Sequence, residues 1–299
     1  MSEERYEWYP GHMTKAVRMM RENLKLIDLV IEIADARIPE ASRNPDIDAM
    51  CGGKARLLIL NKADLSDPNG LRAWISYYRS QGLDTILLNA TESGARGKLN
   101  AAIQKASEAR RKRNKERGLI NQPIRALVAG IPNVGKSTVI NLLAGRTTAK
   151  TGNKPGVTRG KQWIQTGKML QLMDTPGILW PRIGDRDAGE MLAIVGSMND
   201  DNIVETALAS GLIARLRDAA PEAVAKRYQL EPSDISGVSP EEVLQAIAKA
   251  RGLLKPGGVT DTDRAAQVLI DDFRKGRLGG ILLQRVTEQN GTEEEGSDE

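Results

Sequence analysis

The chain has 299 residues, of which 40% are hydrophobic, and its 43 basic and 39 acidic residues give a formal net charge of +4. This length and apolar content exclude a disordered chain or a small disulfide-stapled protein, and they suit two domains with mainly aliphatic cores. The single cysteine, Cys51, has no internal disulfide partner, and neither a secretory leader nor a run of about 18 apolar residues is recognised. We therefore expect a cytoplasmic protein without a membrane partner.

The charge is unevenly distributed along the chain. Six acidic residues and no basic residue lie in 288–299, which leaves a formal charge of +10 on residues 1–287. Charge-rich polar termini are typically disordered, so we expect an acidic, disordered tail at 288–299. The basic body indicates polyanionic partners.

Apolar runs bounded by turn residues predict six strands separated mostly by helices. In chain order, the strands are expected at 28–34, 56–60, 85–88, 125–129, 162–166 and 169–173. The helical stretches are expected at 71–81, 99–113 and 136–144. This alternation favours an α/β fold with a six-stranded, mostly parallel sheet over residues 1–180.

After residue 181 the strand signals almost vanish and helix starts replace them. Ser239 and Glu242 form a capping-box pattern around a proline, a similar pattern begins at Thr260, and Gly276 is a natural helix stop. These signals predict a smaller all-α domain over residues 185–285.

A strongly basic segment lies at 105–117, between the third and fourth strands. Its cations are Lys105, Arg110, Arg111, Lys112, Arg113, Lys115 and Arg117. A solvated helix end and a phosphate-contacting patch both fit this composition.

Residues 130–137 read GIPNVGKS, match the GxxxxGK[ST] pattern, and lie between an expected strand and an expected helix. The glycines let backbone N–H groups face phosphates, Lys136 can reach the β and γ phosphates, and Ser137 offers a hydroxyl to Mg²⁺. We therefore expect a nucleoside triphosphate site at this loop.

The strand at 56–60 is followed by Asn61-Lys62-Ala63-Asp64, which resembles the NKxD guanine-reading motif of GTPases. The Asp64 carboxylate can accept hydrogen bonds from guanine N1–H and the 2-amino group, whereas adenine would leave this charge unpaired. Asn89 and Ala90 fit the weaker motif that supports guanine with a backbone N–H, although that motif usually reads Ser-Ala. The expected guanine-binding residues are Asn61, Lys62, Asp64, Asn89 and Ala90.

Two more motifs belong to the phosphate end of the site. Asp174 begins the sequence DTPG, which resembles the DxxG element that holds Mg²⁺ through water and senses the γ-phosphate with the N–H of Gly177. Thr158, in the loop KPGVTRG, can bring a second hydroxyl to the metal. The expected Mg²⁺ site uses Ser137, Thr158 and Asp174. The expected phosphate-binding residues are Asn133, Val134, Gly135, Lys136, Ser137, Thr138 and Gly177.

The order of these motifs is unusual. Ras-like GTPases run from the P-loop through DxxG to NKxD, whereas this chain places NKAD before the P-loop. This order indicates a circular permutation, which a fold tolerates where the original termini lie close together. As a consequence, the segment after DTPG leads directly into the helical domain.

The motifs WYPGHM, DARIP (35–39), NKAD, GIPNVGKS, PGVTRG and DTPGI, in this order, resemble the circularly permuted ribosome biogenesis GTPase A family over nearly the whole chain. The resemblance implies a permuted P-loop GTPase domain followed by a helical RNA- or ribosome-binding domain. It implies GTP/GDP and Mg²⁺ as cofactors, and the precursor of the large ribosomal subunit with its rRNA as partners. Subunit-stimulated hydrolysis of GTP would act as a conformational checkpoint in late maturation. We expect a monomer off the ribosome and no DNA partner.

His12 is the only histidine of the chain. Ras-like enzymes commonly position the attacking water with a glutamine directly after DxxG, and here Ile178 holds that place. The permuted order brings the segment of His12 towards the γ-phosphate, and the resemblance likewise carries a catalytic histidine onto it. We expect His12 to position the water, the alternative being a side chain that packs or caps a turn.

Several assignments remain open at this point. Asn133 matches a P-loop asparagine that coordinates K⁺ in potassium-dependent GTPases, so K⁺ is a candidate cofactor. Arg37 and Arg182 are unranked candidates for switch or RNA contacts, and 272–279 resembles the family's C-terminal signature and is the candidate RNA-facing end. The competing functions are a guanine-nucleotide-gated RNA-binding scaffold with incidental hydrolysis, and a permuted GTPase that acts on the small subunit or another RNA.

Overall fold

A computed structural model describes residues 18, 20–119, 122–145, 162–175, 186–198 and 204–286. Its centre is a six-stranded sheet with the strand order β3-β2-β1-β4-β6-β5. The strands are β1 (Leu29–Asp35), β2 (Ala55–Asn61), β3 (Asp84–Leu88), β4 (Ile124–Ala129), β5 (Gln162–Thr166) and β6 (Leu170–Asp174). All neighbours pair in parallel except β5, which pairs antiparallel with β6 at one edge. The expected α/β fold with a mostly parallel sheet is confirmed.

The buried strands explain why the apolar runs were so clear. All seven residues of β1 are buried, because the strand lies in the middle of the sheet with layers of structure on both faces. This burial includes Glu32, whose carboxylate accepts hydrogen bonds from Arg43 and Arg56.

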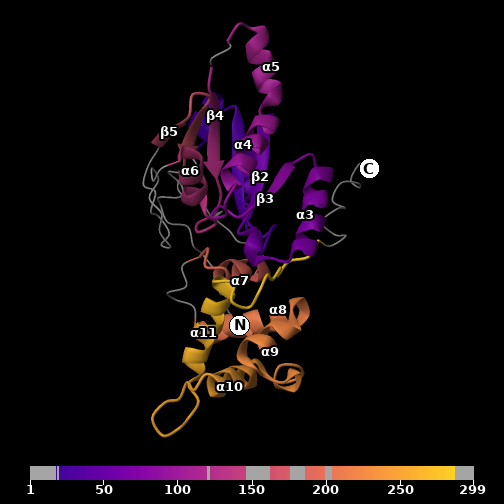
Figure 1. The fold of residues 1–299 in the computed structure, drawn as a ribbon, viewed down its shortest axis with the longest axis vertical. Coiled ribbons are helices and arrows are strands. Elements are labelled where there is room, and N and C mark those ends of the chain that lie inside the picture. Colours follow the sequence, from indigo (N-terminus) through magenta and orange to yellow (C-terminus); the bar gives the residue numbers. More distant parts are fainter. Residues whose placement is uncertain are drawn as a thin grey trace, which may run out of the picture.

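Helices flank the sheet and continue beyond it. Around the sheet lie η1 (Leu24–Leu26), α2 (Pro45–Met50), η2 (Ala63–Leu65), α3 (Pro68–Ser80), α4 (Ala95–Ala106), α5 (Glu108–Glu116) and α6 (Lys136–Ala144). After the sheet follow α7 (Arg186–Ile194), α8 (Glu205–Ala219), α9 (Pro221–Tyr228), η3 (Pro232–Asp234), α10 (Pro240–Ala250) and α11 (Thr262–Arg274). Figure 1 shows α7–α11 at one end of the sheet and α5 protruding from the opposite end.

Two helix predictions need correction. The stretch 99–113 was expected to be one helix, but it is broken at Ser107, whose hydroxyl donates to the Ile103 carbonyl at 2.7 Å. Such back-bonding bends a helix. The start of α11 is capped by Asp261 rather than Thr260, since the Asp261 carboxylate accepts from the Arg264 N–H. The capping box at Ser239 and Glu242 is present as expected.

The chain returns to the sheet after α11. The N–H of Ile281 donates to the Leu65 carbonyl, and the N–H of Leu283 donates to the Arg37 carbonyl. Trp74 on α3 donates from its indole to the Gln284 carbonyl at 2.8 Å. One continuous cluster of buried apolar side chains extends from β1 and β4 into α8, α10 and α11. Within the described part of the chain, no helix combines the length and apolar character that crossing a membrane requires.

Candidate nucleotide site

The P-loop joins β4 to α6 and has a shape that only glycine permits at two positions. Gly130 has φ +151°, and a Cβ there would lie 2.4 Å from the Ile33 carbonyl oxygen. Gly135 has φ +98°, and its Cβ would lie 2.3 Å from Nδ2 of Asn61. No side chain caps the start of α6 at Gly135, so the first N–H groups of this helix remain available to an anion.

Lys136, at the start of α6, is buried, and its Nζ donates to the Ile131 carbonyl at 2.6 Å. Burial lowers the pKa of Lys136 to about 8, although the nearby carboxylate of Asp174 opposes this shift. Ser137 and Thr138 follow in the first helical turn and are half-buried. The loop therefore presents a cation and a helix N-terminus together, as a triphosphate requires.

Asp174 ends β6 beside the P-loop strand, with which its register partner is Val128. Its side chain is buried, and its charge acts on Lys136. A hydroxyl of Ser137 and a carboxylate of Asp174 are the hard oxygen donors that Mg²⁺ prefers. The residues present therefore fit a Mg²⁺ ion bound with the nucleotide.

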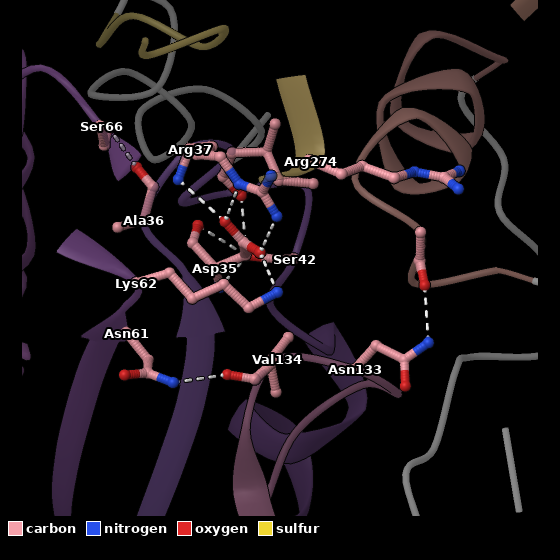
Figure 2. Close-up of polar contacts among 12 residues, drawn as sticks. Asp35, Ala36, Arg37, Ser42, Asn61, Lys62, Ser66, Asn133, Val134 and Arg274 are labelled. Carbon is pink, nitrogen blue, oxygen red and sulfur yellow. Dashed lines mark hydrogen bonds and ion pairs between the residues drawn. The ribbon is translucent and has the colours of Figure 1, made fainter. Parts of the chain in front are cut away.

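Asn61 holds three loops together. This side chain is buried and donates from Nδ2 to the Val134 carbonyl at 2.8 Å (Figure 2). Its Oδ1 accepts from the Ala90 N–H at 3.3 Å. It was expected to bind guanine, but the contacts in the structure are with the P-loop and the 89–91 loop. The Ala90 N–H, expected to support the base, donates to Asn61. Asn89 accepts from the N–H and hydroxyl of Thr91 within its own turn.

Asp64, the expected guanine reader, is exposed at the same edge of the sheet, one residue into η2. Lys62 precedes it with a left-handed backbone, at φ +59°. The Lys62 ammonium pairs with the buried carboxylate of Asp35 at 2.9 Å. Burial lowers the pKa of Lys62, an effect that Asp35 opposes. Lys62 therefore couples the NKAD loop to the end of β1, where Asp35 is the register partner of Asn61.

Arg37 completes this charge cluster. Its Nε and Nη2 donate to the two Asp35 oxygens at 2.9 and 2.7 Å, and both side chains are about fully buried (Figure 2). Burial alone would raise the pKa of Asp35, but Arg37 and Lys62 outweigh it and hold that pKa well below its usual range. The guanidinium also lies over the Phe273 ring, 5.3 Å from its centroid. Arg37 is therefore an internal anchor, and its candidacy for an exposed RNA contact is wrong.

Sequence reasoning missed this cluster of Asp35, Arg37 and Lys62. The signal was present in the DARIP element, which places two opposite charges two residues apart at the end of a buried strand. Such charges either pair with each other or lower the stability of the fold as unpaired buried charges.

The P-loop also contacts the helix that follows the DTPG segment. Asn133 has a left-handed backbone at φ +60°, and its Nδ2 donates to the Gly196 carbonyl at 2.7 Å. From α11, Arg274 donates to the carbonyls of Ala193 and Ile194 at 2.7 and 2.9 Å. Carbonyl groups at the C-terminal end of α7 thus accept bonds from both the P-loop and α11.

The candidate RNA-facing end at 272–279 is largely engaged inside the protein. Asp272 and Phe273 are buried, and Asp272 accepts bonds from Arg227 and Arg277. Lys275 is exposed, but its ammonium pairs with Asp271. This stretch is therefore mainly structural.

Five other residues of the sequence analysis lie outside the described residues. They are His12, Thr158, Gly177, Ile178 and Arg182.

Comparison with known proteins agrees with this geometry. A family model described as a 50S ribosome-binding GTPase matches residues 125–239. A Bacillus cereus protein named Ribosome biogenesis GTPase A is 41% identical over 284 residues, covering 94% of each chain. This chain belongs to the ribosome biogenesis GTPase A family.

More distant relatives also match over nine-tenths or more of both chains. The Ribosome biogenesis GTPase A of Thermotoga maritima is 32% identical and covers 93% of this chain and 94% of its own. The crystal structure of GNP-bound YlqF from T. maritima has a TM-score of 0.63 at 29% identity, over 91% of this chain and 98% of that one. A GDP-bound YlqF structure has the same TM-score at 28% identity, over 90% and 99% of the two chains.

The family membership makes this protein a GTPase that binds GTP and GDP. The matched model begins at the P-loop strand, whereas NKAD lies at 61–64, before the matched range. The two halves of the nucleotide site nevertheless meet in space, because β1, β2 and β4 are neighbours and their carboxyl ends share one edge.

Proposed function

We propose that this GTPase binds the precursor of the large ribosomal subunit and its rRNA, and that hydrolysis stimulated by the subunit acts as a checkpoint in late maturation. The names of its relatives and the 50S ribosome-binding description of the matched family support this role. We place the activity in the cytoplasm, on a protein that is monomeric off the ribosome.

The observation that carries the checkpoint is the contact between Asn133 and Gly196. Asn133 belongs to the P-loop, and its side chain donates to the Gly196 carbonyl just beyond α7, so this bond would transmit changes at the phosphates to the helical part. Arg274 extends this link to α11. In this proposal residues 1–180 are the GTPase domain, 185–285 bind RNA or the ribosome, and 288–299 are a solvated tail.

The proposed chemistry assigns a role to each group at the site. Asp64 reads guanine, and Lys136 with the N–H groups of 133–138 and Gly177 holds the phosphates. Mg²⁺, when bound with the nucleotide by Ser137, Thr158 and Asp174, neutralises developing phosphate charge. Asn61 holds the base-reading and phosphate loops in register, and His12 positions the water. The side-chain amide oxygen of Asn133 is the group that would ligate K⁺.

The test is GTP turnover of the wild type and His12→Ala, each alone and with purified large or small subunits, in K⁺ and in Na⁺ buffer. The proposal expects stimulation by large subunits, loss of that stimulation in His12→Ala with GDP affinity retained, and slower turnover in Na⁺. Stimulation by small subunits alone would instead favour the alternative that this GTPase acts on the small subunit. If subunit binding depends on GTP but the subunit does not stimulate hydrolysis, the guanine-nucleotide-gated RNA-binding scaffold is favoured.

A further inference from the structure

Helix α5 is not explained by the core of the protein. Its nine residues read EARRKRNKE, and only Asn114 among them is buried. A helix that is polar on all sides gains little from tertiary packing. It nevertheless protrudes from the end of the sheet opposite α7–α11 (Figure 1).

The base of α5 is fixed and its outer side is charged. Arg110 pairs with Asp28, just before β1, at 2.8 Å, which sets the direction of the helix. Beyond this anchor, four cations are exposed, and two carboxylates, Glu108 and Glu116, lie in the same helix. The exposed cations are Lys112, Arg113, Lys115 and Arg117.

A cavity of about 270 Å³ adjoins the helix at the end of the sheet where β4 and β6 begin. Three cations, Arg96, Arg111 and Lys168, take part in its lining, and among the described residues no Asp or Glu does. The Nε of Arg111 is buried and has no hydrogen-bond partner there. The cavity is lined by cations without a carboxylate among the described residues, and the partly exposed guanidinium of Arg111 can donate into it, so its charge selects an anionic occupant.

We infer that α5 and this cavity form a docking surface for the phosphate backbone of structured RNA. One phosphate enters the cavity and accepts from Arg111, while neighbouring phosphates lie along Lys112 and Lys115. A helix of nine residues is about 13 Å long, so its cations match a run of phosphates rather than one small ion. The surface carries no aromatic side chain on α5, which suits sequence-independent backbone contacts.

This inference rests on the proposed ribosomal role and adds a surface remote from the nucleotide. The test compares Lys112→Gln/Lys115→Gln and Arg111→Gln with the wild type. The matched control is Arg72→Gln/Arg79→Gln, which removes two exposed cations from α3. Glutamine keeps helix propensity, and far-UV circular dichroism with GDP affinity verifies the fold of every variant.

The first measurement is binding to a labelled 20-base-pair RNA duplex between 0.05 and 0.3 M KCl. Each lost phosphate contact weakens binding roughly eightfold at 0.1 M salt and lowers the salt slope by about one. For Lys112→Gln/Lys115→Gln, called the α5 double variant, we therefore expect about a 60-fold loss of affinity and a change of about two in the salt slope. We expect about an eightfold loss for Arg111→Gln and no change for the control. Inorganic phosphate should compete with the duplex more strongly than chloride at equal ionic strength, and equal competition would remove the cavity from the proposal.

The second measurement is co-sedimentation of the same proteins with purified large subunits. Sedimentation of the wild type and the control, but not of the α5 double variant, supports the docking surface. If all variants sediment equally, the surface is wrong while the proposed ribosomal role stands. If even the wild type fails to sediment, the proposed role itself fails. Loss of subunit binding without any duplex binding by the wild type would assign the surface to a protein partner and overturn the RNA assignment.

Discussion

Replacing Arg37 by glutamine should leave the Asp35 carboxylate buried with too little positive charge. The Nη2–Oδ2 distance is 2.7 Å, and the two side chains are 1% and 0% exposed. At this distance and an effective dielectric constant of about 20, two unit charges attract by roughly 6 kcal/mol. Burial of both charges offsets much of this, but breaking a buried pair by removing one partner typically costs about 3–5 kcal/mol. Because Lys62 still pairs with Asp35, we expect the lower end, about 3 kcal/mol of the free energy of unfolding.

The assay is urea unfolding of Arg37→Gln, Asp35→Asn and the double variant, followed by circular dichroism. The cycle should show a coupling of at least about 1.5 kcal/mol, since the double variant no longer carries an unpaired buried carboxylate. Arg72→Gln, on the exposed side of α3, is the control and should stay within about 0.5 kcal/mol of the wild type. A loss under about 1 kcal/mol for Arg37→Gln, or strict additivity of the two single variants, would refute the pairing argument.

Three further predictions concern charge and loop register. Because Arg37 and Lys62 hold the pKa of Asp35 below its usual range, its stabilising effect is present above about pH 4 and declines as the pH falls below it; Asp35→Asn should flatten urea midpoints measured between pH 3 and 5. Lys136, with a pKa of about 8, must be charged to hold phosphate, so calorimetry in two buffers should show uptake of about half a proton on GTP binding at pH 8 and about 0.9 proton at pH 9, where the GTP phosphates are already ionised; equal uptake at both would contradict this. Asn61→Ala breaks both loop contacts and should weaken GDP binding about 10- to 100-fold by fluorescence titration, whereas unchanged affinity would exclude the bridging role.

The sheet and the P-loop could be predicted from the sequence because their signals are local. Buried parallel strands are continuous apolar runs, and the helix at Lys136 begins directly after a glycine that its motif requires. The break at Ser107 was missed, since a hydroxyl bond to the preceding turn leaves the composition helical.

The partners of the polar groups could not be predicted in the same way. Arg37 looks like an exposed cation in the sequence, and only the return of the chain to Leu283 and the position of Phe273 bury it. Asn61 was assigned to the base by its motif, but its contact with Val134 joins residues 73 positions apart. Such long-range contacts are set by the order of the strands, which periodicity does not encode.

Helices α7–α11 are tied to the sheet at both of their ends. The chain leaves the sheet after Asp174 at the end of β6 and comes back through 281–286, where Ile281 bonds to Leu65 and Trp74 bonds to Gln284. Between these two crossings, one cluster of buried apolar side chains joins the sheet to α8, α10 and α11, so the helices are also held along a packed face. The loop between α10 and α11, which carries the exposed side chain of Leu254, lies at the end of these helices farthest from the sheet (Figure 1). In the proposed checkpoint, a displacement beside the phosphates would reach this loop only through the packed core, so core substitutions between the sheet and α8 should uncouple the two ends without touching the nucleotide.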